Sequence, residues 1–220
     1  AGISEHAYCG SLDDNLMHKD LLEMAKMLRP AFLINAIHTP DGGLAAFFAG
    51  DWEQAWLAGC RAITSIYGVV FREKADIVIA SAGGTPKDMN LYQGTKAMDN
   101  AVLAVKSTGV VILTLACPEI GEPPDFSKWF EHGVEWREER LRENFTVPGF
   151  VALKCGYDLK RIPHILVTLP QNREFVERAG FIYAPNLQQA FSAAKQIVNN
   201  LDYRVIIMPD AANTVPLFTT

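Results

Sequence analysis

The sequence predicts a three-layer α/β fold: a largely parallel sheet with helices on both faces and an added N-terminal β-hairpin. From residue 76 onward, short β-branched runs alternate with segments of helical periodicity. The runs 76–80 (DIVIA) and 110–116 (VVILTLA) are almost continuously apolar, which is typical of strands covered on both faces. Helical segments between such runs imply right-handed crossovers and therefore parallel strands. With 220 residues, of which 49% are hydrophobic, the chain has enough apolar material for a single α/β domain over residues 1–220.

The N-terminal part of the chain predicts a helix followed by a hairpin. Apolar residues recur every three or four positions between Asp14 and Pro30, and the proline marks the end of this helix. The strand-like runs 31–38 and 44–48 then flank residues 40–43 (PDGG), a turn sequence, so we expect two antiparallel strands here.

The remaining elements follow from caps, breakers and apolar runs. Asp51 followed by Gln54 resembles a capping box and predicts the start of a helix. The breaker cluster 81–86 (SAGGTP) separates a strand from a helix over residues 88–106. Three further strands are predicted at 164–169, 181–184 and 204–208, of which 181–184 is weak. One further helix is predicted at 187–199.

Charge and composition exclude several classes of protein. The formal net charge of -5 argues against a nucleic-acid partner, because phosphate-backbone binders carry a basic face. No run approaches the roughly 20 apolar residues of a membrane-spanning helix, so we expect no membrane partner. The densely charged segment 135–143 predicts a solvated helical face. The cysteines lie far apart without CxxC spacing, which favours reduced thiols in a cytoplasmic protein over a zinc or iron–sulfur site; they are Cys9, Cys60, Cys117 and Cys155.

The loops after the predicted strands are candidates for a ligand site, because ligands of open α/β sheets collect at the carboxyl ends of the strands. The first of these loops contains Gly83 and Gly84, which permit a positive φ or close approach of a ligand. The helix that follows presents free N–H groups to an anion, so the loop predicts a phosphate or carboxylate site. A plain strand-to-helix turn uses the same residues. Neither GxGxxG nor GxxxxGK[ST] is present.

Three polar residues on the helix after this loop form one ridge. Asn90, Gln93 and Lys96 recur every three residues and therefore lie along one side of the helix start. A lysine here could bind a carboxylate as a point charge, and a glutamine could hydrogen-bond a hydroxyl or carbonyl group. Solvated helix faces carry similar residues, so the spacing leaves both interpretations open.

Residues 76–101 (DIVIASAGGTPKDMNLYQGTKAMDNA) resemble the signature of the C-terminal domain of the nickel-pincer lactate racemase family. That signature reads as an aspartate, an apolar strand, Ser-x-Gly-Gly-x-Pro, Asn-Leu-Tyr-Gln and a lysine three residues beyond the glutamine. The resemblance continues through 47–59 (FFAGDWEQAWLAG) and 110–129, becomes looser after Val147, and extends to 205–218 (VIIMPDAANTVPLF). It therefore covers nearly the whole chain.

The resemblance implies an activity and two site residues. Enzymes of this family interconvert the enantiomers of a 2-hydroxy acid by hydride transfer to a nickel-pincer nucleotide, while a histidine takes the hydroxyl proton. Gln93 and Lys96 match the glutamine and lysine that the family places at the substrate. Lys96 would clamp the carboxylate or stabilise the developing carbonyl oxygen, and Gln93 would orient the substrate.

The resemblance also suggests further residues that bind the substrate or the cofactor. Phe150 is the nearest position to a tryptophan of the family's active site, and a phenylalanine there would question lactate as the substrate. Together with Phe150, the candidate substrate- or cofactor-binding residues are Gly83, Gly84 and Asn90.

Other motifs of the family have no match in this chain. The histidines that act as acid and base, the lysine that bonds to the pincer and an Asp-x-x-Thr-Arg motif belong to an N-terminal domain. His6 lies near the position of a nickel-ligating histidine, but a surface histidine is the simpler interpretation. No two histidines show metal-ligand spacing, so no metal site is predicted here.

The chain, which begins at Ala1 without methionine, is therefore expected to be half of an enzyme. Its expected partners are the N-terminal domain of the same protein and a small 2-hydroxy acid, and the nickel-pincer nucleotide is expected only in the full-length protein. Two alternatives remain. One is a non-enzymatic α/β domain that binds an anion or a partner at the double-glycine loop. The other is a dinucleotide-dependent oxidoreductase, which the missing glycine fingerprint disfavours.

Overall fold

The computed structural model describes residues 6–8, 10–39 and 42–218, and its contacts divide the chain into two compact units. Unit 1 comprises residues 1–70 and 219–220, and unit 2 comprises residues 71–218. Within unit 1, the two strands of the hairpin pack against each other and against the helix that follows them.

Unit 1 confirms the predicted hairpin and the two helices beside it. Its elements are α1 (Leu16–Leu28), β1 (Leu33–His38), β2 (Leu44–Gly50) and α2 (Trp52–Tyr67). The strands β1 and β2 pair antiparallel, with Leu33 opposite Gly50. The Asp51 side chain accepts a hydrogen bond of 3.0 Å from the backbone N–H of Gln54, so the predicted capping residue does begin α2. Pro40 and Asp41 of the predicted turn lie outside the described residues, as does Cys9.

Unit 2 contains a five-stranded sheet in the order β7-β6-β5-β4-β8, with every neighbouring pair parallel. The weak run 181–184 does form a strand. The strands are β4 (Ala75–Ser81), β5 (Val105–Thr114), β6 (His164–Val167), β7 (Ile182–Ala184) and β8 (Val205–Met208). Two short strands lie outside this sheet, β3 (Gly68–Phe71) and β9 (Val215–Phe218).

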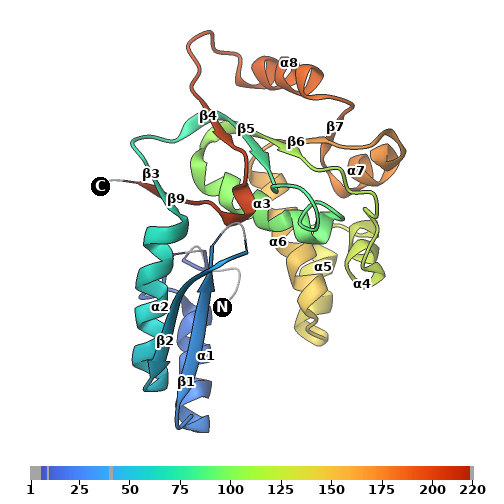
Figure 1. Ribbon diagram of the computed structural model, residues 1–220. Helices are drawn as coiled ribbons and strands as arrows, with labels where there is room; N and C mark the ends of the chain where they lie inside the picture. The colour runs from blue at the N-terminus through green and yellow to red at the C-terminus, as the bar shows by residue number, and fades with distance from the viewer. Residues whose placement is uncertain (1–5, 9, 40–41, 219–220) are drawn as a thin grey trace. The chain divides into compact units, whose positions relative to one another are not determined.

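Helices cover both faces of the sheet, as predicted (Figure 1). Because side chains alternate along a strand, neighbouring residues of β4 enter different cores. Val78 packs in the core shared with α3 (Leu91–Ala104) and α6 (Val147–Arg161), whereas Ile77 packs with Ala190 and Ala194 of α8 (Leu187–Val198). The remaining helices are α4 (Pro124–Ser127), α5 (Val134–Glu143), α7 (Arg173–Ala179) and the 3₁₀ helices η1 (Lys128–Glu131), η2 (Pro170–Asn172) and η3 (Ala211–Asn213).

Two boundaries near the site differ from the prediction. The helix predicted over 88–106 begins at Leu91 and ends at Ala104, because Val105 already has extended φ and ψ angles of -96° and 146°. Strand β5 accordingly begins at Val105, before the run 110–116. A register irregularity against β4 follows, since Ala75 lies opposite Val105 but Ile77 lies opposite Val110.

Helix α5 is less fully solvated than its charged sequence predicted, because Arg137 is buried with 4% of its surface exposed. Its Nε donates to the carbonyl oxygens of Trp129 and His132, and its Nη1 donates to that of Ala152. Burial lowers the pKa of the Arg137 guanidinium. The guanidinium thus joins η1, α5 and α6 through carbonyl groups, a role that a charge count along the sequence cannot reveal.

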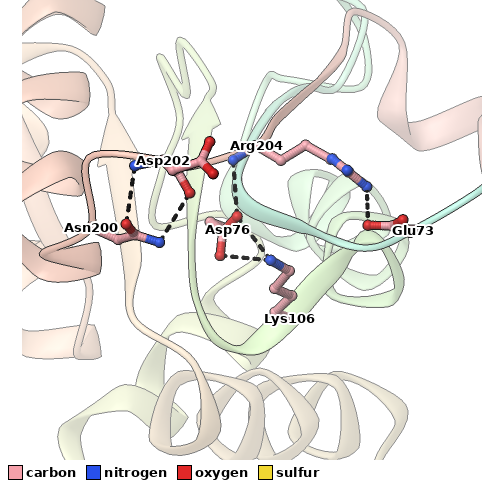
Figure 2. A network of polar contacts seen from close by, with 6 residues as sticks. All are labelled: Glu73, Asp76, Lys106, Asn200, Asp202 and Arg204. Carbon is pink, nitrogen blue, oxygen red and sulfur yellow. Dashed lines mark hydrogen bonds and ion pairs between the residues drawn. The ribbon is translucent and has the colours of Figure 1, made fainter.

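A polar network around Asp76 stabilises the amino-terminal edge of the sheet, where its strands begin (Figure 2). Its carboxylate accepts hydrogen bonds from Lys106 Nζ at 2.9 and 3.0 Å and from the backbone N–H of Arg204 at 2.9 Å. Desolvation acts to raise the pKa of Asp76, but the bonds from Arg204 and Lys106 outweigh it and lower the pKa. Arg204 also pairs with Glu73. This network fixes the starts of β4 and β8.

A buried histidine makes the stability of unit 2 depend on pH. His164 is 1% exposed, its Nδ1 lies 2.8 Å from the carbonyl oxygen of Ile162, and burial lowers its pKa from 6.5 to about 4. The folded state therefore favours neutral imidazole, and this contribution is complete above pH 6.5 and is lost as the pH falls toward 4. From this shift we expect a loss of about 3 kcal/mol in the free energy of unfolding between pH 7 and pH 4.

We expect the His164→Gln variant, which does not titrate, to lose less stability than the wild type between pH 7 and pH 5. Urea denaturation at each pH, followed by circular dichroism, measures the difference. Parallel pH profiles for the two proteins would contradict the assigned burial of a neutral imidazole.

Among the described residues, none of the helices is both long enough and apolar enough to cross a bilayer.

Candidate functional site at the carboxyl edge of the sheet

The loops after four strands of the sheet meet at one edge, as the sequence predicted. The backbone N–H of Cys117, after β5, donates to the carbonyl oxygen of Asp88, after β4, at 2.8 Å. The hydroxyl of Thr168, after β6, donates to the carbonyl oxygen of Ala116 at 2.8 Å. Lys87 pairs with Asp210, after β8, at 3.2 Å. Direct contacts therefore connect these loops into one rim.

The backbone conformation of the loop after β4 requires glycine at positions 83 and 84. Gly83 and Gly84 have φ angles of 90° and 86°, a region that side chains rarely adopt. A Cβ atom on Gly83 would lie 2.5 Å from Oδ1 of Asp210, whereas one on Gly84 would meet nothing within 4 Å. The N–H of Gly83 donates to Ser81 Oγ at 3.1 Å. Gly83 therefore allows the loop to pack closely against Asp210, whereas the space around Gly84 is open.

Asn90 has a structural role that the sequence analysis did not assign to it. It is the N-cap of α3, and its Oδ1 accepts a hydrogen bond of 2.9 Å from the backbone N–H of Gln93. One of the helix N–H groups expected to face an anion is therefore satisfied within the chain.

Gln93 and Lys96 lie at the surface of α3, not in its core. Lys96 is exposed and Gln93 is partly buried, while Leu91, Gly94 and Thr95 beside them are buried. The Lys96 Nζ donates to Oε1 of Gln93 at 2.9 Å. The two predicted residues therefore form a hydrogen-bonded pair that presents amide and ammonium groups to solvent.

The ammonium group of Lys96 differs from most others of unit 2 in lacking a carboxylate partner. Within the described parts of the chain its polar contact is the neutral amide of Gln93. By contrast, carboxylates pair with Lys87, Lys106, Lys128, Lys154 and Lys160. Lys96 is accordingly a cation whose charge is available to an anionic ligand, on the helix that starts at the rim.

Phe150 lies on α6, whereas Gln93 and Lys96 lie on α3. It occupies the first turn of α6 and is partly buried, and its ring centre lies 6.0 Å from that of Phe145. The preceding Gly149 lets α6 approach η1, because a Cβ there would lie 2.4 Å from the Trp129 ring. The ring of Phe145 is therefore an aromatic neighbour of Phe150.

Several residues that build the rim were not predicted from the sequence. Lys87 and Asp210 connect the first and last loops, and Asn172 is a buried amide at the end of η2. Cys117 has a positive φ of 48°. The loops that contain these residues could be located from breakers and strand ends, but no local signal indicated which residues would meet across them.

Comparison with known proteins relates the chain to lactate racemases. Residues 70–144 match the family model described as the lactate racemase C-terminal domain. A lactate racemase from Thermoanaerobacterium thermosaccharolyticum is 29% identical over 221 residues, covering 96% of this chain and 50% of that protein. The lactate racemase of Lactiplantibacillus plantarum is 36% identical over 110 residues, which cover 50% of this chain and 26% of that protein.

Solved structures give the same relationship. The lactate racemase apoprotein from T. thermosaccharolyticum superposes with a TM-score of 0.87 at 30% identity, covering 97% of this chain and 52% of that one. A Thermotoga maritima protein shares the fold, with a TM-score of 0.64 at 11% identity. The chain spans about half the length of the T. thermosaccharolyticum racemase that it matches over nearly all its own length. The resemblance predicted from the sequence is thus confirmed: residues 70–144 match the lactate racemase C-terminal domain, and nearly the whole chain is similar in sequence and in fold to a lactate racemase.

Proposed function

We propose that the chain forms one wall of the catalytic cleft of a 2-hydroxy acid racemase or epimerase of the lactate type, and that an N-terminal domain of the same protein forms the other wall. The relationship to lactate racemases supports this proposal, as does their greater length. The observation that carries it is the exposed ammonium group of Lys96, which has no carboxylate partner among the described residues and is hydrogen-bonded to Gln93 on α3.

In this proposal the ammonium group of Lys96 binds the anionic substrate. It clamps the carboxylate or stabilises the negative charge that develops on the 2-oxygen as that carbon becomes trigonal. Gln93 has one amide oxygen directed to Lys96 and retains its NH₂ group to donate to a substrate oxygen. Both groups are held by one helix, so their relative position needs little rearrangement when the substrate arrives.

The proposed cofactor is a nickel-pincer nucleotide, which supplies a hydride acceptor when bound. The described residues do not fit the metal part of this group, because they contain no set of three His, Cys, Asp or Glu side chains able to hold a metal ion. We therefore assign the nickel ligands and the proton-transferring groups to the N-terminal domain. Candidate contacts from this chain to the cofactor or substrate are Gly83, Gly84, Asn90 and Phe150.

The proposal places the enzyme in the cytoplasm, since Cys60, Cys117 and Cys155 are free thiols.

The test is racemisation by the complete protein with its cofactor. We expect each pure enantiomer of a 2-hydroxy acid, with lactate as the first substrate, to be converted to a mixture, measured by chiral chromatography. This chain alone should give no saturable heat with the same acid in isothermal titration, because one wall of the cleft is missing. Tight binding by the chain alone would favour the non-enzymatic anion-binding domain instead.

A further inference from the structure

A strained residue lies in the middle of the rim. Cys117 has a φ of 48°, a left-handed conformation that costs free energy for any residue with a Cβ atom. Its side chain is buried, and burial raises the pKa of its thiol to about 12, so the thiol is not a nucleophile near neutral pH. The conformation therefore serves the backbone of the loop rather than the chemistry of the sulfur.

The backbone of Cys117 connects the loop after β5 to the start of α3. Its N–H donates to the carbonyl oxygen of Asp88 at 2.8 Å, and the N–H of Glu119 donates to that of Met89 at 3.0 Å. Asp88 and Met89 immediately precede Asn90, the N-cap of α3. These two hydrogen bonds thus fix the segment from which the helix carrying Gln93 and Lys96 begins.

A buried amide holds Cys117 in this conformation. Asn172, 3% exposed, donates from Nδ2 to the carbonyl oxygen of Cys117 at 2.8 Å, to that of Ala116 at 3.4 Å and to Thr168 Oγ1 at 3.0 Å. Thr168, 6% exposed, donates from its hydroxyl to the same carbonyl oxygen of Ala116. Both residues follow β6, so the clamp formed by Thr168, Asn172 and the backbone of residues 116–117 spans two strand ends.

We propose that Asn172 is a positioning residue: by holding Cys117 in its left-handed conformation, it sets the start of α3 and thereby the position of Gln93 and Lys96. Asn172 does not itself contact Gln93 or Lys96 in the described structure; its effect passes through the backbone of residues 117–119 and 88–89. The effect of Asn172 on catalysis rests on the function proposed above, whereas the clamp of hydrogen bonds does not.

Hydrogen exchange of this chain tests the clamp without reference to activity. In the Asn172→Ala variant we expect the amides of Cys117 and Glu119 to exchange about tenfold faster than in the wild type, because the loop no longer holds its bonds to residues 88 and 89. Glycine adopts the left-handed conformation without strain. The Asn172→Ala/Cys117→Gly double variant should therefore recover most of the slow exchange. A loss caused only by the cavity at position 172 would not recover.

Asn186→Ala is the matched control, because Asn186 caps α8 on the other face of the sheet through a bond of 2.9 Å to the N–H of Gln189. It should leave exchange at residues 117 and 119 unchanged. Unchanged exchange in Asn172→Ala, an equal increase in Asn186→Ala, or no recovery in the double variant would overturn the proposal.

In the complete protein, Asn172→Ala should lower kcat/KM for racemisation between tenfold and a hundredfold, about the effect of a displacement near 1 Å. The double variant should regain part of this loss. A wild-type protein that racemises no 2-hydroxy acid would defeat the proposed function, and the exchange experiment would still decide the clamp. Altered exchange with full racemase activity would reject the positioning role alone.

Discussion

Replacing Lys96 by alanine in the complete protein is expected to lower kcat/KM for racemisation of a 2-hydroxy acid by about a hundredfold to a thousandfold. The variant removes the exposed ammonium group that lacks a carboxylate partner, and with it the charge opposite the substrate carboxylate or its developing oxyanion. The loss of one such donor typically has an effect of this size. Chiral chromatography of initial rates measures it, and Lys96→Arg should restore only part of the activity, because its planar group differs from a point charge.

Lys195→Ala is the appropriate control for this experiment. Lys195 is also an exposed lysine of a long helix. Its helix, α8, packs against the face of the sheet opposite to that covered by α3. Lys106 would be a poor control, since it binds the carboxylate of Asp76 and its loss would disturb the starts of β4 and β8. Equal rates for Lys96→Ala, Lys195→Ala and the wild type would remove Lys96 from the mechanism.

Replacing Phe126 by alanine is expected to destabilise this chain by about 4 kcal/mol. Phe126 is fully buried, and its ring meets those of Tyr92 and Phe130 edge to face, with centres 5.2 and 5.0 Å away. Truncation removes both aromatic contacts and leaves a cavity beneath the first turn of α3. Urea denaturation should show a lower midpoint with an unchanged slope.

Phe145→Ala provides the comparison, because Phe145 is 63% exposed and has one ring contact, with Phe150. It should change the free energy of unfolding by less than about 0.5 kcal/mol. Similar midpoints for Phe126→Ala and Phe145→Ala would show that the buried ring of Phe126 does not stabilise the chain through its contacts with Tyr92 and Phe130.

Most of the strands near the site could be predicted from local patterns, but helix α6 could not. The apolar runs at β4 and β5 indicated buried strands, and even the weak run 181–184 formed β7. Helix α6 was not predicted, because Pro148 and Gly149 are helix breakers when considered alone. In the structure the proline stands in the first turn, where its missing N–H has no cost, and Gly149 admits the Trp129 ring. Both residues thus have a role that only the neighbouring elements reveal.

The sequence by itself determined most of the strands and helices, the loops after the strands, and the position of Gln93 and Lys96 on one side of a helix, because periodicity and residue spacing are local properties. Only the tertiary structure decided that Lys96 has no carboxylate partner in the described part of the chain, that Asn90 is occupied as a cap, and that Asn172 reaches Cys117. These contacts depend on which strand ends become neighbours in the sheet. Residues 117 and 172 are brought together by the pairing of β5 with β6, and nothing in either segment alone specifies that pairing.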